Sequence, residues 1–252
     1  MWLQALEGWT MRYPYYPYFP VVLDILHSRA AEQVLDAPCG TGWLGDNLHA
    51  TARGSVELDG VGLWEFPEAG GGYREVIEHD LETPLSLNRQ YDAAVCCEAI
   101  HLVTNPGVLV ESLRRALRPG GTVVITTPNT WYFRSRLQFL LRGFHSGFRP
   151  MVGRQRGQDY ITYFPWSYPQ LHLLLSHYGY VDITLHEVDE VKPKRMLEHL
   201  LALPSRLYYR QRIKRAESEE ARQFWREAAR DQSVHGRWLV VSARRSVEDM
   251  AA

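Results

Sequence analysis

The chain has 252 residues, of which 45% are hydrophobic and 23% are charged, and three of them are cysteines. This composition is typical of a globular domain and excludes both a disordered chain and a disulfide-stabilised miniprotein. The formal net charge of −1 provides no overall attraction to a polyanion, so no nucleic-acid partner is expected.

The cysteines are Cys39, Cys96 and Cys97. The last two are neighbours in an apolar run, where strand geometry directs them to opposite faces, so they cannot readily bridge. No Cys or His spacing indicates a metal site. The sequence shows neither a signal-peptide pattern nor an apolar stretch of about 20 residues, and a cytoplasmic location is therefore expected.

Strand and helix patterns alternate through the first half of the chain. Apolar spacing predicts helices at 21–31 and 43–50. Short apolar runs predict four strands, at 33–37, 55–61, 73–78 and 91–97.

Asn105-Pro106 is typical of a helix N-terminus, and Pro119-Gly-Gly121 ends that helix. A strand is expected at 122–126. Alternation of this kind indicates a Rossmann-like, doubly wound α/β sheet.

The regular alternation of strand and helix patterns ends after Asn129. Residues 131–141 are aromatic and basic, and a helix and a strand are expected at 169–178 and 180–186. A basic helical region at 192–230, broken at Pro204, precedes a last strand at 238–242.

Val34–Gly42 combines a buried strand, the acidic residue Asp36 and a glycine turn. Such a turn brings backbone N–H groups close to a ligand, because Gly40 and Gly42 have no Cβ to hold it away. The carboxylate of Asp36 suits a ligand that carries a cation.

The glycine pattern alone leaves two cofactors open. With Gly45, the turn also matches the G-x-G-x-x-G fingerprint of dinucleotide-binding domains, so an NAD-dependent oxidoreductase is one alternative.

The Asp-Ala-Pro-Cys run before the glycines and several later motifs favour another class. The chain resembles the class I S-adenosylmethionine-dependent methyltransferases, in particular the ubiquinone-type, bacterial small-molecule and surface-polysaccharide group. The matching motifs are Asp36–Gly42, with Pro38 in place of a glycine, then Asp80-Leu81, Tyr91-Asp92, Glu98, Leu117–Gly121 and Thr127–Asn129. The resemblance covers about residues 30–130.

This resemblance implies a mostly parallel seven-stranded sheet whose last strand is antiparallel. It also implies that S-adenosyl-L-methionine is the cofactor. The residues implied at the methionine end are Asp36, Ala37, Pro38, Gly40 and Gly42. The resemblance places Asp80 and Leu81 near the adenine, with Glu98 close by.

Two positions depart from the family pattern. The acidic residue that holds the ribose after the second strand is replaced by Gly62, so Asp59 or Glu65 is expected to take that role. The family's Glu-His pair after the fourth strand reads His101-Leu102 here. His101 is a candidate general base for a hydroxyl acceptor, and a histidine packed under a loop is the alternative.

The whole chain, 1–252, is interpreted as a single methyltransferase domain. Its expected parts are an N-terminal arm or lid (1–32), a cofactor-binding core (33–130), acceptor-side elaborations (131–178 and 190–232) and a final strand (233–246). The acceptor is expected to be a small molecule or a glycan, which could be lipid-linked. A non-catalytic S-adenosylmethionine-binding protein is a further alternative.

The segment 192–215 carries leucines at helical spacing among arginines and lysines. Two interpretations stay open: peripheral contact with an anionic membrane, and a covering helix with its charged side in water. The pattern does not determine the oligomeric state.

Overall fold

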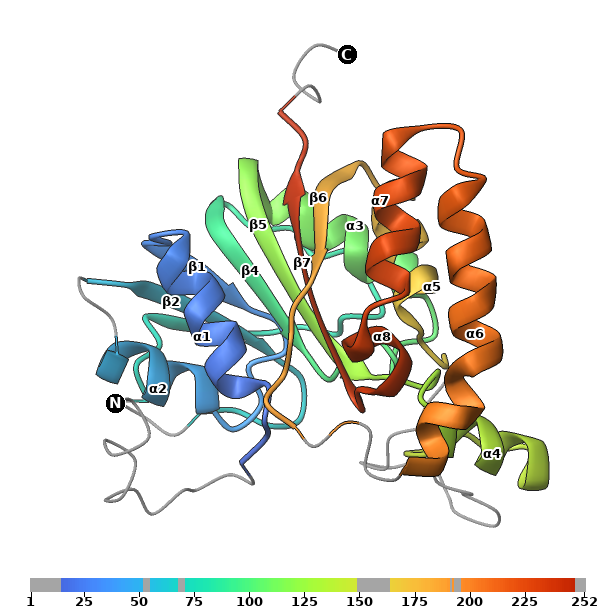
Figure 1. The fold of residues 1–252 in the computed structure, drawn as a ribbon. Coiled ribbons are helices and arrows are strands. Elements are labelled where there is room, and N and C mark those ends of the chain that lie inside the picture. The colour runs from blue at the N-terminus through green and yellow to red at the C-terminus, as the bar shows by residue number, and fades with distance from the viewer. Residues whose placement is uncertain are drawn as a thin grey trace.

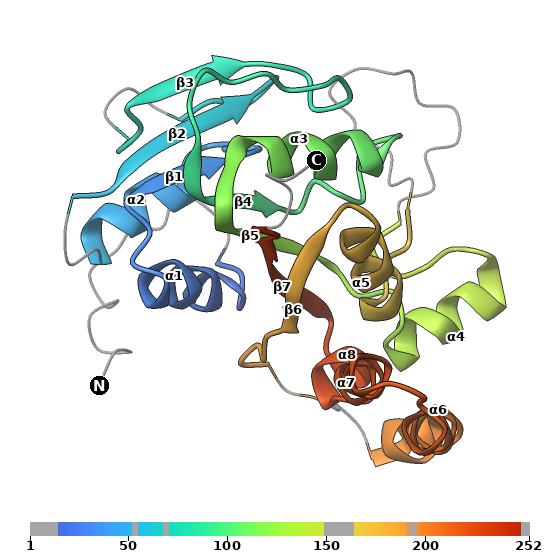
Figure 2. The same ribbon diagram turned by 90° about the horizontal axis from the view of Figure 1, so that it is seen from above.

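The computed structural model describes residues 15–51, 55–67, 71–148, 164–190, 192 and 196–247. Its strands form one sheet in the order β3-β2-β1-β4-β5-β7-β6 (Figures 1 and 2). The bounds are β1 Gln33–Asp36, β2 Glu57–Gly62, β3 Glu75–Glu78, β4 Tyr91–Cys97, β5 Leu117–Pro128, β6 Tyr180–Leu185 and β7 Trp238–Arg245.

Strands β1 to β5 are parallel to one another, and β7 runs antiparallel to both of its neighbours, β5 and β6. The sequence prediction of a doubly wound, seven-stranded sheet with an antiparallel last strand is confirmed. The carboxyl ends of β1, β4 and β5 therefore meet at one edge, where α/β sheets of this kind bind ligands.

Helices cover both faces of the sheet (Figure 2). Their bounds are α1 Phe19–Ser28, α2 Trp43–Thr51, α3 Pro106–Ala116, α4 Phe133–Arg142, α5 Tyr168–His177, α6 Met196–Lys214, α7 Glu219–Ala228 and α8 Asp231–His235. None of these helices has the length and hydropathy of a membrane-spanning segment, within the part of the chain that is described.

The strand β4 shows why its sequence is almost wholly apolar. Ala94 and Cys96 belong to the core under α3 and α5, whereas Ala93, Val95 and Cys97 belong to the core under α1 and α2. A strand that is covered on both faces buries every residue, so hydrophobicity does not alternate along it.

The bounds of several elements differ from the expected ones, and α1 and β5 are two examples. α1 starts at Phe19, with Pro20 in its first turn, and ends at Ser28 before Ala30, whose φ is +48°. β5 already begins at Leu117, because Leu117 pairs with Tyr91 ahead of the regular register.

The break expected at Pro204 is wrong. α6 runs through this proline, and the chain turns only before Ser218, whose side chain caps α7. Ala202 and Tyr209, on either side of Pro204, are buried and pack inward. Tertiary packing of this face outweighs the loss of one backbone hydrogen bond at the proline. The short helix α8 was not anticipated.

The described part of the predicted N-terminal arm packs against the sheet. Tyr16 and Tyr18 each lie edge-on to Trp238 of β7, and Phe19 stacks on Trp43 with ring centroids 3.9 Å apart. Residues 1–14, which belong to the same predicted arm, lie outside the described residues, as does 149–163 of the predicted acceptor side.

Candidate cofactor site and active site

The turn after β1 is held by backbone hydrogen bonds to the neighbouring strands. The N–H of Ala37 donates to the carbonyl of Val95 at 2.9 Å, and that of Cys39 donates to Val61 at 2.8 Å. The turn that contains the half-buried Pro38 is therefore fixed to β4 on one side and to β2 on the other.

Both predicted glycines of the turn adopt left-handed backbone conformations, with φ +49° at Gly40 and +95° at Gly42. An added Cβ at Gly42 would lie 2.9 Å from Cβ of Pro67. At Gly40 the nearest atom would be Oε2 of Glu65, 3.9 Å away. A side chain would therefore collide with Pro67 at Gly42, whereas the space beside Gly40 is open.

Asp36, the last residue of β1, is fully buried. Its Oδ2 accepts a hydrogen bond of 2.6 Å from the hydroxyl of Tyr73, while its Oδ1 has no hydrogen-bond partner among the described residues. Burial raises the pKa of this carboxyl to about 7, and the hydrogen bond from Tyr73 acts in the opposite direction. A buried carboxylate without a cation favours a ligand that supplies one.

Tyr73 was missed by the sequence analysis, because its contact with Asp36 spans 37 positions. Two glycines make room for its ring. An added Cβ would lie 2.9 Å from Cδ1 of Tyr73 at Gly60, and 2.5 Å from Cε2 at Gly45. The third glycine of the apparent dinucleotide fingerprint, Gly45, is therefore explained by close packing, since an added Cβ would also lie 2.2 Å from the carbonyl oxygen of Gly71.

The structure places Asp59 away from Asp36. Asp59 is in register with Leu35, and Gly60 is in register with Asp36. Because strand side chains alternate, Asp59 and Asp36 project from opposite faces of the sheet.

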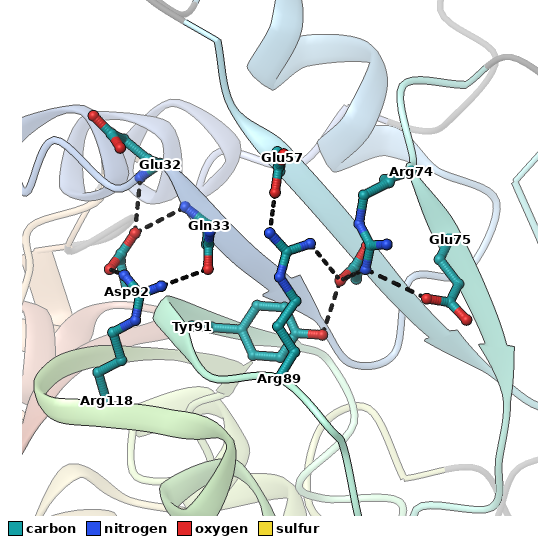
Figure 3. Close-up of polar contacts among 10 residues, drawn as sticks. Glu32, Gln33, Glu57, Arg74, Glu75, Arg89, Tyr91, Asp92 and Arg118 are labelled. Atoms are coloured by element: carbon teal, nitrogen blue, oxygen red, sulfur yellow. Dashed lines mark hydrogen bonds and ion pairs between the residues drawn. The ribbon is translucent and has the colours of Figure 1, made fainter.

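The carboxylate of Asp59 belongs to a cluster of arginines (Figure 3). Its Oδ2 accepts from Nη2 of Arg74 at 2.5 Å and from the hydroxyl of Tyr91 at 2.9 Å, and Nη1 of Arg89 lies 3.8 Å away. The other ribose candidate, Glu65, extends its carboxylate toward the turn at Gly40 instead.

Asp80 and Leu81 follow β3, at the same edge of the sheet. Oδ1 of the exposed Asp80 accepts from the N–H of Glu82 at 3.0 Å. The half-buried Leu81 packs against the core under α3. The N–H of His79 donates to Gly62 at 2.9 Å, which ties this loop to the end of β2.

Glu98 follows β4 with a left-handed φ of +56°. Its N–H donates to the carbonyl of Thr126 at 3.1 Å, and the hydroxyl of Thr126 donates to Oε1 of Glu98 at 3.2 Å. Burial raises the pKa of Glu98 to about 8. The positive φ turns the chain back at the carboxyl end of the sheet, where both Asp36 and Glu98 lie.

His101 lies in the loop after β4 with 9% of its surface exposed. Its Nδ1 is 3.2 Å from the hydroxyl of Thr127, at the end of β5. Burial lowers the pKa of His101 to about 4, so the imidazole is neutral at physiological pH. The segment after residue 163 closes over this loop, since Nε1 of Trp166 donates to the carbonyl of Ile100 at 3.2 Å.

The fold is that of a Rossmann-like domain, with the buried carboxylate of Asp36 at the carboxyl edge of its sheet. The family model described as "Methyltransferase domain" matches residues 12–185. The chain therefore belongs to the methyltransferase-domain family. This assignment confirms the predicted class, S-adenosylmethionine-dependent methyltransferases, and S-adenosyl-L-methionine as the cofactor of that class.

Relatives with curated names are ubiquinone biosynthesis O-methyltransferases. The protein of Dechloromonas aromatica is 28% identical over 115 residues, which are 42% of this chain and 49% of the relative. The protein of Acinetobacter baumannii (strain AYE) is 28% identical over 126 residues, or 44% and 51%. The chain thus matches about half the length of these curated relatives.

Among solved structures, human N-acetylserotonin methyltransferase in complex with SAM superposes with a TM-score of 0.50 at 12% identity. The match covers 91% of this chain and 52% of the human protein. A likeness at this level of identity supports the shared fold.

Proposed function

We propose that this protein transfers the methyl group of S-adenosylmethionine to a hydroxyl group of a small molecule or a glycan. The observation that carries the proposal is the carboxylate of Asp36, which is buried, has no cationic partner within the part of the chain that the structure describes, and lies beside the open backbone at Gly40. The names of the curated relatives support oxygen as the atom that is methylated.

The residue before the glycine turn and the backbone of the turn itself would hold the cofactor. Asp36 faces its ammonium group, and the backbone from Ala37 through Pro38 to Gly42 cradles the methionine part. Of the two ribose candidates, Glu65 fits and Asp59 does not, because the arginine cluster already holds the Asp59 carboxylate.

Two further parts of the site complete the proposal. Asp80 and Leu81 would border the adenine, since their loop is tied to the end of β2. Glu98 lies at the end of β4, with its carboxyl oriented by Thr126.

His101 is proposed as the general base. If its Nδ1–H donates to the hydroxyl of Thr127, Nε2 keeps the free lone pair. Nε2 could then accept the proton that an acceptor hydroxyl gives up when its oxygen is methylated. The bound cofactor supplies the electrophilic methyl on a sulfonium, so the protein mainly positions the reactants.

A cytoplasmic location is part of the same proposal. The three cysteines Cys39, Cys96 and Cys97 are buried and free, which agrees with a reducing compartment.

Thermal unfolding with each cofactor tests the proposed class. S-adenosylhomocysteine at a hundred times its dissociation constant should add about 2.7 kcal/mol of stability, whereas NAD should add none. Stabilisation by NAD alone would favour the oxidoreductase alternative.

Formation of S-adenosylhomocysteine from a panel of phenols, catechols and glycosides tests catalysis. His101→Gln should lower turnover by about 10²-fold or more and leave cofactor affinity unchanged. Cofactor binding without turnover on any acceptor would favour a binding protein, and full activity of His101→Gln would remove this residue from the mechanism.

A further inference from the structure

Helices α4 and α6 lie next to each other beyond the β7–β6 side of the sheet (Figures 1 and 2). Nη1 of Arg136 on α4 donates to the hydroxyl of Ser205 on α6 at 3.0 Å and joins the two helices. α4 follows the carboxyl end of β5 after a short turn, so the pair borders the acceptor side of the candidate site.

Both helices expose large apolar side chains to solvent. On α6 the exposed fractions are 88% at Met196, 63% at Leu200, 49% at Leu203 and 61% at Leu207. These positions alternate by four and three residues and form one stripe along the helix. The stripe faces away from the packed side of α6, where Ala202 and Tyr209 are buried. The stripe is therefore not the side of α6 that packs against the rest of the protein.

On α4, Leu137, Leu140 and Leu141 are 40%, 81% and 75% exposed, and they lie away from the buried Ser135. These leucines form a separate apolar set, because α4 contacts α6 at Ser205, on the packed side of α6 and opposite its stripe. We call the α6 stripe of Met196, Leu200, Leu203 and Leu207 the leucine face. Isolated exposed leucines are ordinary, but a continuous stripe of them along a helix marks an interaction surface.

The charges around the leucine face are almost all positive. The α6 stripe continues at the same spacing into Arg210 and Lys214, both of them exposed. Glu198 is the sole acidic residue in the sequence of α6. Since the whole chain has a net charge of −1, this positive charge is local.

The charges distinguish between possible partners of this face. In a dimer of this chain built on the leucine face, the cations of both copies would lie in one interface and repel one another. A nucleic acid would satisfy the cations and leave the leucines in water. An anionic bilayer satisfies both, since it takes leucines into its acyl boundary and pairs cations with its headgroups.

We propose that the leucine face of α6 docks this protein onto an anionic lipid surface. Docking does not require that the protein be a methyltransferase. If the proposed function holds, the contact presents the acceptor side of the sheet to a lipid-linked or membrane-dissolved hydroxyl compound.

Co-sedimentation of the full chain with vesicles tests the docking. The protein should bind vesicles of mixed phosphatidylglycerol and phosphatidylcholine, bind pure phosphatidylcholine weakly, and be released by salt because the headgroup attraction is screened. The double variant Leu200→Gln/Leu207→Gln should weaken binding to the mixed vesicles by about tenfold or more, since two apolar side chains no longer enter the bilayer. Glutamine keeps a high helix propensity, so α6 should stay intact.

Leu173→Gln is the matched control, because Leu173 is 61% exposed on α5, outside the leucine face. It should bind vesicles like the wild type. The proposal would be overturned if Leu173→Gln lost as much vesicle binding as the double variant, or if the double variant bound vesicles like the wild type. It would also be overturned by a dimer in light scattering that the double variant abolishes, because a second copy would then cover the face.

Affinity for S-adenosylhomocysteine, measured on the same variants, should not change. Failure of vesicle binding with intact cofactor affinity would reject the docking alone, whereas lack of cofactor binding in the wild type would reject the proposed function alone.

Discussion

Asp36 and Asp59 are aspartates on the neighbouring strands β1 and β2, with 0% and 1% of their surface exposed. Each has one carboxylate oxygen that accepts hydrogen bonds and one that has no hydrogen-bond partner in the described part of the chain. Their surroundings differ in charge. Asp59 lies against the guanidinium groups of Arg74 and Arg89, whereas Asp36 receives a single hydrogen bond from the uncharged hydroxyl of Tyr73.

This difference in surrounding charge indicates two roles. The carboxylate of Asp59 stabilises the fold, whereas that of Asp36 is available to a ligand. A buried charge is stable when fixed cations compensate it, as they do for Asp59 (Figure 3). Without such a cation, burial raises the pKa of Asp36 to about 7. In the proposed function, the ammonium group of the bound cofactor would supply the missing charge.

The largest effect is expected from removing the Asp36 charge. Asp36→Asn keeps an oxygen that can accept from Tyr73 but loses the attraction to an ammonium group. The affinity for S-adenosylhomocysteine should fall on the order of 100-fold, as measured by calorimetry. The free energy of unfolding should not decrease, because the substitution removes an uncompensated buried charge. Unchanged affinity would remove Asp36 from the cofactor site.

The reciprocal change, Asp59→Asn, should lower the free energy of unfolding by about 1–3 kcal/mol, measured by urea denaturation. This is below the loss expected for a fully buried pair, because Arg74 and Arg89 are 43% and 29% exposed and can regain water. Cofactor affinity should stay near the wild-type value. A large loss of affinity in a variant of normal stability would show that Asp59 holds the cofactor after all.

The pH dependence should also distinguish the two carboxylates. Below its pKa of about 7, Asp36 is protonated and attracts no ammonium, so cofactor affinity should rise with pH by up to about tenfold per unit until it levels off above 7. Glu98, with a pKa of about 8, titrates in the same range and direction. Glu98→Gln should therefore keep the rise centred near pH 7, and Asp36→Asn should abolish it.

Linkage predicts the opposite trend for stability without cofactor. The pKa of Asp36 is higher in the folded state than its ordinary value of 3.8, so its contribution to stability is fully present below pH 3.8 and is lost as pH rises through about 7. Asp36→Asn should lack this component of the decline between pH 5 and pH 8, which urea titrations at several pH values can measure.

The smallest effect is expected at the two tyrosine donors. Tyr73→Phe removes the hydrogen bond to Asp36 and should weaken cofactor binding by about fivefold, which corresponds to about 1 kcal/mol. Tyr91→Phe removes the equivalent donor from Asp59 and is the matched control. It should lower stability without changing cofactor affinity, and equal effects of both substitutions on affinity would contradict the distinction.

Much of the candidate cofactor site could be predicted from local sequence. Asp36 and the glycines of the turn occupy contiguous positions, so strand burial and left-handed glycine conformations define their geometry without reference to the rest of the chain. The sheet class was predictable for a similar reason, because apolar runs alternate with helical spacing before residue 130. The antiparallel direction of the last strand came from family resemblance. Its place between β5 and β6 was not predicted, because no local pattern specifies a strand's partner.

The tertiary structure alone decided which carboxylates stay available. Asp59 seemed equivalent to Glu65 in sequence, and only strand register shows that it projects from the opposite face of the sheet to Asp36. Tyr73 reaches Asp36 across 37 positions, through space that Gly45 and Gly60 leave open. Periodicity predicts local backbone conformation and burial, whereas the charge that surrounds a buried carboxylate depends on residues that only chain packing brings together.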